Sequence, residues 1–556
     1  MATIRILLPD QLGDHFIDDA PGQIKILLPA KDLWLRKMHR AKAQWWLSAI
    51  LHRKEELGKR CEIIECESVA EFANSFKEKA SVIAPTSFHN RKAFMGKDNF
   101  EKLPSRGFVT SEKDFTNWIS QRAGKKLRLE DFYRHARVMH SVLVDPEDQP
   151  VGGAWNFDHD NRLSPPKNVT KLNLKPAYYP VEDEIDELAR KKIKEYEKQG
   201  YVFVGKDDKR EFAATVSETK KVFKNFIETR LNQFGPMEDA SLTNDWHMSH
   251  SLLSAPMNIG LIDPMFLIKS VEKELKNGAP IASVEGFIRQ IMGWRDYIWH
   301  LYWYFGEDYV KDNNYLKANN KLPDWLANLD TKNVKANCLK TVVSDLEQRA
   351  WVHHIQRLMM LGNWCMQQGI NPQELVDFFD RLFIDGHPWV MAANVIGMSQ
   401  YADGGKMSTK PYTSGGSYIN KMSNFCGGCV YKPDVRVGKD ACPFTAGYWK
   451  FLNTHKDKFA KNPRMSQYAD GGKMSTKPYT SGGSYINKMS NFCGGCVYKP
   501  DVRVGKDACP FTAGYWKFLN THKDKFAKNP RMSQGVNGLK RLKDLDQLLK
   551  EKSNTI

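Results

Sequence analysis

Cysteines in the C-terminal half constrain this chain more than any other feature of its sequence. A lone residue, Cys338, is followed far downstream by a Cys-Gly-Gly-Cys pair, a twelve-residue spacer and a Cys-Pro dipeptide, which contribute Cys426, Cys429 and Cys442. A tight pair supplies two sulfur ligands from one turn, and the fold must bring two more beside it to complete a four-thiolate site. The spacing therefore predicts a metal centre, and taken alone it suits zinc and an iron–sulfur cluster equally.

A long internal repeat complicates this prediction. Residues 401–467 recur without a single change as residues 468–534, so that Cys493, Cys496 and Cys509 duplicate the three downstream cysteines. Solenoid repeats have periods of ~20–50 residues, whereas this period is 67 residues and its copies have not diverged. The identity indicates a recent duplication or an assembly error in the sequence record. We expect one copy to occupy the native position, so Cys338 is completed by one or the other set of three.

Composition excludes several classes of protein. The 556 residues allow two or three domains with full-sized cores, and ten cysteines are too few for a disulfide scaffold of this length. No apolar run approaches the ~20 residues of a membrane span, and the N-terminus lacks the order of a signal peptide. We therefore expect a soluble, cytoplasmic monomer with no membrane partner.

The charge balance points weakly to a polyanion. The formal net charge is +17, part of which the repeat counts twice. The remaining excess of Lys and Arg fits a partner such as DNA, although many basic proteins bind none.

Hydrophobic patterning divides the chain into two structural regimes. Strand and helix signals alternate up to about residue 125, with strands expected near 4–8, 24–28 and 61–65 and a helix over 33–57, the pattern of a parallel α/β sheet. From residue 181 strand signals nearly vanish. Helices are then expected over 182–199, 214–234, 264–276, 284–304, 340–360 and 373–384. We predict a Rossmann-like α/β domain followed by a large all-α domain. The expected ranges are 1–130 for the α/β domain, 131–180 for a connector, 181–467 for the helical domain, 468–534 for the duplicate and 535–556 for a C-terminal helix.

Several motifs in the helical half carry chemistry. Each also has an ordinary structural explanation: serines cap helices, Trp and Arg pack between helices, and adjacent histidines can be structural. The motifs contain, in chain order, Ser251, Leu253 and Ser254; Gln290, Trp294 and Arg295; His353 and His354; Asp385; and Asn394.

The order of these motifs resembles the flavin-binding half of the photolyase/cryptochrome superfamily. The cysteine spacing narrows the resemblance to its iron–sulfur bacterial branch, the prokaryotic (6-4) photolyases and deoxyribodipyrimidine photolyase-related proteins. Further matches are Gly-Gly-Ala-Trp-Asn-Phe-Asp at 152–158 and Tyr-Ala-Asp-Gly-Gly at 401–405. The resemblance implies an α/β antenna-type domain, a helical domain that binds FAD, a 4Fe–4S cluster and UV-damaged DNA as partner.

Carried over residue by residue, the resemblance implies a set of cofactor-binding side chains. The Ser-x-Leu-Ser loop would donate to the FAD phosphates, as the free N–H groups of a helix start should. The cofactor-binding residues implied are Ser251, Leu253, Ser254, Gln290, Trp294, Arg295, Asp385 and Asn394, with Asp10 and Gln11 in the first loop of the α/β domain. The cluster ligands are Cys338, Cys426, Cys429 and Cys442.

His354, with His353 beside it, is the expected catalytic residue. Relatives that reverse cyclobutane dimers have asparagine at this position, whereas (6-4) photolyases have histidine. Reversing a (6-4) adduct moves a hydroxyl between bases and needs a proton donor, for which an imidazole with a pKa near 6.5 is suited. Four residues later this chain has Leu358, as expected for the bacterial branch.

The resemblance implies a light-driven DNA-repair lyase. Such an enzyme reverses (6-4) pyrimidine photoproducts by photoinduced electron transfer from FAD, with a histidine as proton donor. A blue-light photoreceptor of the same fold is the alternative, and a non-catalytic, zinc-stabilised nucleic-acid-binding protein is a third hypothesis. Iron and flavin content would separate the third from the first two.

Two segments depart from the family pattern. Relatives reduce FAD through a tryptophan/tyrosine relay, but the corresponding helix here contains Phe378 and Phe379, which are much harder to oxidise; Trp364 offers another route. Relatives also bind a lumazine antenna, 6,7-dimethyl-8-ribityllumazine, against an acidic strand end. The matching stretch here, residues 28–32, reads Leu-Pro-Ala-Lys-Asp.

Overall fold

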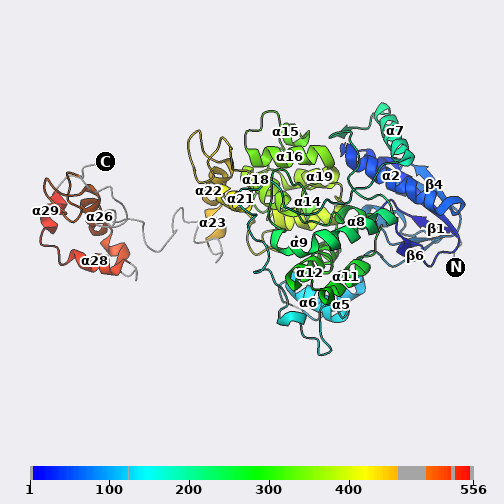
Figure 1. Ribbon diagram of the computed structural model, residues 1–556, viewed down its shortest axis with the longest axis horizontal. Coiled ribbons are helices and arrows are strands. Elements are labelled where there is room, and N and C mark those ends of the chain that lie inside the picture. The colour runs from blue at the N-terminus through cyan, green and yellow to red at the C-terminus, as the bar shows by residue number, and fades with distance from the viewer. Residues whose placement is uncertain (1–3, 123, 461–495, 528–531, 551–556) are drawn as a thin grey trace. The chain divides into compact units, whose positions relative to one another are not determined.

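The computed structural model describes residues 4–122, 124–460, 496–527 and 532–550 (Figure 1). The chain forms two compact units, Met1–Tyr448 and Trp449–Ile556. No helix among the described residues is both long enough and apolar enough to cross a membrane.

A five-stranded parallel sheet forms the N-terminal part of the first unit, as the alternating pattern predicted. The strand order is β4-β2-β1-β5-β6, with β1 at Ile4–Leu7, β2 at Gln23–Pro29, β4 at Cys61–Cys66, β5 at Ala80–Ile83 and β6 at Phe100–Leu103. The apolar runs of β1 and β5 are wholly buried, because helices cover a parallel sheet on both faces. The chain adds strands on one side of β1 and then returns to its other side at β5. The first loop, with Asp10 and Gln11, therefore lies at a topological switch point.

The first long helix is shorter than expected. A single helix over 33–57 was predicted, but the chain forms α1 (Ala30–Trp34), a two-residue strand β3 (Met38–His39) and then α2 (Arg40–Leu57). The side chain of His39 caps α2 by accepting a hydrogen bond from the backbone N–H of Ala41 at 3.1 Å. Strand β3 pairs with β7 (Phe203–Val204), a contact distant in sequence that no local pattern indicates.

Helices make up nearly all the rest of the first unit. Near the sheet lie η1 (Asp14–Phe16), η2 (Gly58–Arg60), α3 (Val69–Ser75) and α4 (Phe88–Ala93). Beyond them the described elements are α5 (Glu112–Ser120), α6 (Leu129–Met139), η3 (Val151–Gly153), α7 (Glu184–Lys198), α8 (Val216–Thr229), α9 (Leu231–Met237), α10 (Ser254–Asn258), α11 (Pro264–Lys273), η4 (Glu274–Asn277), α12 (Ile281–Ile288), η5 (Arg289–Arg295), α13 (Asp296–Phe305), α14 (Tyr309–Asp312), α15 (Asp324–Ala327), α16 (Asn337–Arg349), α17 (His354–Gln356), η6 (Arg357–Gly362), α18 (Asn363–Gln368), α19 (Pro372–Leu382), α20 (Pro388–Met391), η7 (Ala392–Ser399), α21 (Gly416–Met422) and α22 (Pro443–Thr454). Helix α5 packs with α6 and α13. Helix α7 packs against α2 (Figure 1).

One expected helix is broken at a place that matters for the site. A continuous helix over 340–360 was predicted, but α16 ends at Arg349 and Ala350 adopts a left-handed conformation with φ 56°. The backbone N–H of Ile384 bonds to the carbonyl of Ala350 at 2.8 Å, which holds this turn in place. The next helical segment begins at His354, so this residue stands at a helix start and not within a packed helix.

The first copy of the repeat packs against the body of the first unit. The Tyr309 hydroxyl donates to Asp403 at 2.9 Å, and the Asn363 side-chain amide donates to the carbonyl of Ser414 at 3.0 Å. The hydroxyl of Thr413 in turn donates to the Asn363 oxygen at 3.1 Å. We call the surface that carries Tyr309 and Asn363 the docking surface.

The second unit contains the described part of the duplicate. Its helices are α23 (Lys456–Phe459), α26 (Pro510–Thr521), α27 (Lys523–Phe526), α28 (Ser533–Leu539) and α29 (Leu545–Lys550). Helices α26 and α27 repeat the bounds of α22 and α23 shifted by one period, so the sequence dictates these helices locally. Leu519, Met532, Val536 and Leu539 form a small core. Two short helices replace the single C-terminal helix that was expected.

Candidate functional site

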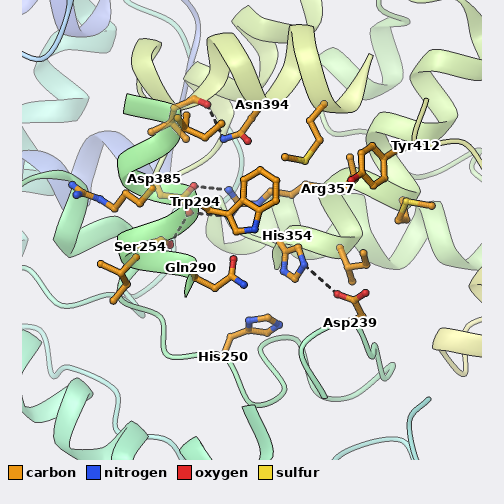
Figure 2. Close-up of a pocket in the computed structure, with 18 of the residues that line it drawn as sticks. Asp239, His250, Ser254, Gln290, Trp294, His354, Arg357, Asp385, Asn394 and Tyr412 are labelled. Carbon is orange, nitrogen blue, oxygen red and sulfur yellow. Dashed lines mark hydrogen bonds and ion pairs between the residues drawn. The ribbon is translucent and has the colours of Figure 1, made fainter. Parts of the chain in front are cut away.

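A cavity of about 640 Å³ lies among the helices of the first unit (Figure 2). Its volume is within the range of small-molecule and cofactor sites. Eight of the ten predicted cofactor-binding residues line it: Ser251, Leu253, Ser254, Gln290, Trp294, Arg295, Asp385 and Asn394. The other two, Asp10 and Gln11, lie in the first loop of the sheet. There Asp10 bonds to Thr86, and Gln11 donates to the carbonyl of Ile83 at 3.3 Å.

Three π-helical segments, η5, η6 and η7, form walls of the cavity. Segments η5 and η6 each lie between two α-helical segments and η7 continues from α20; π-helical turns are rare and are frequently found at functional sites. The wider turn changes which side chains face inward. It contributes Gln290 and Trp294 from η5, Arg357 from η6 and Asn394 from η7.

Asp385 is held by a network at the base of the cavity (Figure 2). Arg357 donates to both of its carboxylate oxygens, at 2.8 and 3.0 Å, and the Ser254 hydroxyl donates at 2.7 Å. Burial alone would raise the pKa of the Asp385 carboxyl, but Arg357 and Ser254 hold it below its usual value. The predicted phosphate-binding serine is thus engaged by a carboxylate. The loop before it is also strained, because Leu252 has a positive φ of 58°.

Arg295 places a partly buried positive charge at the cavity wall. Its hydrogen-bond partners are neutral oxygens: the carbonyl of Gly107 at 2.7 Å, the side chain of Asn258 at 3.2 Å and the carbonyl of Met257 at 3.4 Å. Its guanidinium also lies 5.2 Å from the ring centroid of Trp389. Desolvation lowers the pKa of Arg295 to about 10, which leaves it cationic at neutral pH. A cation that lines a cavity and is bonded to neutral groups suits an anionic ligand such as a phosphate.

His354 projects into the cavity beside an acidic partner. Its Nε2 lies 3.2 Å from Asp239 Oδ1, and its side chain is 52% exposed whereas that of Asp239 is 11% exposed. Burial would raise the pKa of the Asp239 carboxyl, but His354 and Arg162 hold it below its usual value. Asp239 is therefore a carboxylate at neutral pH. It can orient the imidazole of His354.

His353, the other predicted catalytic residue, does not line the cavity. It is buried behind it, with Nε2 3.0 Å from the Ser241 hydroxyl. Burial lowers its pKa well below the usual value, so its imidazole is neutral at neutral pH.

The four predicted cysteines come together as the spacing required. Cys338, at the start of α16, lines a small second cavity with Cys426, Cys429 and Cys442. Burial, together with the neighbouring thiols of Cys442 and Cys429, raises the pKa of the Cys426 thiol to about 11. A Cβ atom on Gly416 would lie 2.6 Å from Cys442 Sγ, so only glycine fits there. In the duplicate, Cys496 is exposed and Cys509 is buried, while Cys493 lies outside the described residues.

A chain of tryptophans runs from the cavity toward the surface. Trp389 lines the cavity, its ring centroid lies 5.8 Å from that of Trp299, and Trp299 lies 5.3 Å from Trp303. Trp389 and Trp299 are buried, while Trp303 is partly exposed beneath Arg91. Phe378 and Phe379, where the family relay was sought, are buried in α19 away from the cavity-lining set. Trp364 packs against Trp325.

Sequence reasoning missed Asp239, His250 and Trp389. Asp239 and His250 stand in an irregular segment between α9 and α10, where no periodicity marks a side chain as facing a cavity. The sequence would have indicated Asp239 as the partner of His354 only if the segments that carry these two residues were already known to lie side by side.

Comparisons with known proteins point in one direction. The family described as "Deoxyribodipyrimidine photo-lyase-related protein" matches residues 7–212. A (6-4) photolyase of Agrobacterium fabrum is 40% identical over 373 residues, which cover 66% of this chain and 71% of that protein. The uncharacterized protein R855 of Acanthamoeba polyphaga mimivirus is 42% identical over 62 residues, 11% of this chain and 48% of its own.

Among solved structures, a bacterial class III photolyase from Agrobacterium tumefaciens aligns with a TM-score of 0.48 at 15% identity. The alignment covers 85% of this chain and 86% of that one. The sequence match to the Agrobacterium fabrum protein is long enough to span most of both chains, which no single motif could achieve.

Proposed function

This chain belongs to the deoxyribodipyrimidine photolyase-related family, and from that premise we propose that it is a DNA photolyase that reverses (6-4) pyrimidine photoproducts in light. The observation that carries the proposal is His354, an ionisable side chain that projects into a cofactor-sized cavity beside a carboxylate. The (6-4) photolyase that is 40% identical supports the same lesion class.

Family membership implies FAD as the cofactor, and the large cavity fits such a group. Its volume is adequate, and Arg295 provides a cation for a phosphate while Trp294 and Trp389 provide apolar walls. We propose that Ser251, Ser254 and Arg295 hold the phosphates and that Gln290, Trp294 and Asn394 line the other wall. When bound and reduced, the flavin supplies the electron that light transfers to the lesion.

The protein's own part in the reaction centres on His354. Its imidazole donates a proton to the lesion, and a positioned general acid of this kind contributes about 10²–10⁴-fold to a rate. Asp239 orients the ring. His353 lies behind this pair and acts, in our proposal, through packing and not through contact with the lesion.

Damaged DNA would reach the cavity as a flipped nucleotide. Lys and Arg side chains neutralise backbone phosphates, in keeping with the basic net charge of +17. Extruding a base from the stack costs a few kcal/mol, and least for a damaged base. We propose that the protein acts as a monomer.

We propose a 4Fe–4S cluster at Cys338, Cys426, Cys429 and Cys442. All four cysteines line one small cavity, and membership of the photolyase-related family favours a cluster over a single zinc ion there.

Cys338→Ser is expected to remove the iron and to lower thermal stability, because Cys338 has no duplicate to replace it. Iron content and melting temperature of the purified protein measure both effects. Cys365→Ser is the matched control, since Cys365 is equally buried in the same hydrophobic core but lies apart from the four thiols. A Cys338→Ser protein with full iron content would refute the assigned ligand set.

Trp299→Phe is expected to slow the light-driven reduction of the bound flavin severely. It removes the oxidisable ring between Trp389 and Trp303 while keeping an aromatic side chain in the core. The loss of oxidised-flavin absorbance under blue light, with a thiol as external reductant, measures the rate. Trp364→Phe is the control and should leave the rate unchanged. The reverse result would assign the route to Trp364.

The α/β part would carry the antenna. We propose that a lumazine binds at the carboxyl ends of the strands, where open parallel sheets bind ligands. Asp10 and Gln11 lie at that edge. The predicted stretch 28–32 is less favourable, because Asp32 already accepts a hydrogen bond from the backbone of Val69 at 2.8 Å.

Repair of an oligonucleotide that carries a defined (6-4) lesion tests the function directly. The protein in its reduced, flavin-loaded form should convert the lesion back to intact bases in blue light and not in darkness. If the flavin-loaded protein repairs no lesion in light or in darkness, the result would favour a photoreceptor of the same fold.

A further inference from the structure

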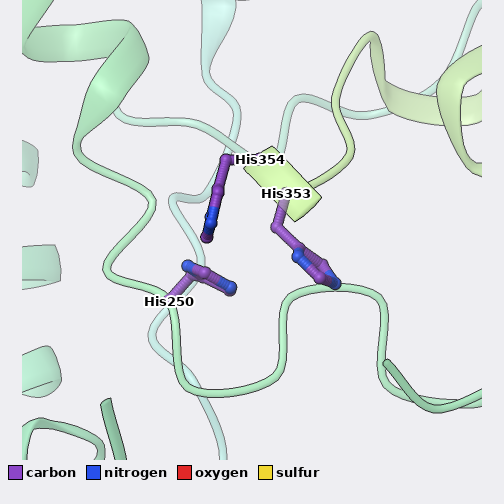
Figure 3. A group of neighbouring side chains, drawn as sticks. All are labelled: His250, His353 and His354. Atoms are coloured by element: carbon purple, nitrogen blue, oxygen red, sulfur yellow. The ribbon is translucent and has the colours of Figure 1, made fainter. Parts of the chain in front are cut away.

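Three imidazole rings converge at the edge of the large cavity. In Figure 3 the ring of His250 lies below that of His354 and to the left of that of His353, on which it stacks with centroids 4.7 Å apart. The centroid of His354 lies 5.9 Å from that of His250. One ring nitrogen from each residue can be chosen so that all three lie within 4.8 Å of one another.

Two of these rings have one nitrogen anchored and the other without a partner. His353 Nε2 contacts the Ser241 hydroxyl at 3.0 Å, whereas its buried Nδ1 has no hydrogen-bond partner. The ring of His250 bonds to the backbone of Glu238, whereas its buried Nε2 has no partner. Metal-binding histidines typically show this arrangement, in which one nitrogen is fixed by the protein and the other is left for the ion.

The surroundings of the three rings give an ion access to them. His354 is half exposed at the cavity wall, and Asp239 adds a carboxylate 3.2 Å from its Nε2. Because His250 and His354 both line the cavity, an ion can enter through it.

We propose that His250, His353 and His354 form a binding site for a borderline divalent cation of the zinc class. Imidazole nitrogen suits zinc, nickel and copper, whereas magnesium and calcium prefer oxygen. A tetrahedral zinc ion with bonds of 2.0–2.1 Å brings nitrogens to about 3.3 Å of one another. Ring rotations that shorten the present separations would complete the site, and a fourth position would face the cavity.

Occupancy of this site would inhibit repair. A nitrogen of His354 bound to zinc is no longer available to donate a proton to a lesion. This consequence rests on the proposed function, whereas zinc binding itself does not and can be measured in darkness without DNA.

The test is a zinc titration of the full chain loaded with its flavin and iron. We expect one site whose affinity falls at least about tenfold in His250→Gln and in His353→Gln. His89→Gln is the matched control, because His89 is exposed on the α/β part and should leave the affinity unchanged. Two variants are used so that misfolding of one does not leave the proposal without a test.

X-ray absorption at the zinc edge then identifies the ligands. A shell of nitrogen near 2.0 Å supports the site, whereas a sulfur shell near 2.3 Å would place the ion on cysteines and overturn the proposal. Equal zinc affinity in all variants would also overturn it. Inhibition of repair by zinc, relieved by a chelator, tests the consequence separately; zinc bound without inhibition would contradict only the role given to His354.

Discussion

Replacing His354 by alanine is expected to lower light-driven repair of a (6-4) lesion by about 10²–10⁴-fold, the contribution of a positioned general acid. The side chain is half exposed in the cavity, so its removal takes away the proton donor without disturbing the buried walls. Flavin content should therefore stay at the wild-type level. Recovery of intact bases from a defined lesion, together with flavin absorbance, measures both properties.

A control on the same wall separates chemistry from packing. Leu358→Ala removes an apolar side chain that also lines the cavity, and it should reduce repair far less than His354→Ala. Asp239→Asn keeps the shape of the carboxylate but removes its charge, and an intermediate loss is expected. Repair at nearly the wild-type rate by His354→Ala would exclude the proton-donor role.

Acidification from pH 6.5 to pH 5 is expected to destabilise the first unit. Burial lowers the pKa of His247, His300 and His387 to about 3 and that of His39 to about 4. The unfolded chain binds protons at these residues below pH 6.5, while the folded chain does not. At pH 5 each residue therefore costs about 2 kcal/mol of stability. Together the four approach the whole folding free energy of a typical protein, ~5–15 kcal/mol.

One buried carboxyl acts in the opposite direction. Burial raises the pKa of Asp296 to about 6, so this group gains a proton in the folded state and adds about 1 kcal/mol at pH 5. It offsets only part of the histidine effect. Denaturant unfolding followed by circular dichroism at several pH values measures the net slope.

A single substitution tests the origin of the acid effect. His300→Phe keeps an aromatic ring against Phe115, on which His300 stacks at 4.5 Å. It should reduce the slope of unfolding free energy against pH by about 1.4 kcal/mol per unit. His159→Ala, at an exposed position, should leave the slope unchanged. Stability that does not change between pH 6.5 and pH 5 would contradict the prediction.

Much of this architecture follows from local sequence patterns. The parallel sheet follows from short apolar runs bounded by loops, and helices such as α7, α11 and α19 follow from their periodicity and caps. The repeat shows how strong local control is, since helices α22 and α26 have the same bounds in different surroundings. The gathering of four cysteines also followed from ligand chemistry.

The features that sequence could not predict depend on contacts between distant segments. The break after α16 is held by Ile384, and the partner of His354 comes from a loop more than a hundred residues earlier. The π-helical segments are invisible to hydrophobic periodicity, because one extra residue per turn does not alter which residue types are apolar. His353 was expected at the site from its position next to His354, but adjacent residues at a helix start point in different directions.

The docking surface of the first repeat copy has a genetic consequence. Residues 470 and 481 repeat the identities of Asp403 and Ser414, so the second copy carries the same residue types that Tyr309 and Asn363 contact in the first. Docking the second copy would close a loop of 67 residues, at an entropic cost of roughly 4 kcal/mol. A mutation in residues 401–467 that weakens the packing of the first copy by more than this free energy would favour packing of the unmutated second copy on the docking surface. The duplication thus limits the loss of stability that such mutations can cause. Substitutions at Cys338 or Asn363 are not limited in this way, because neither residue is duplicated.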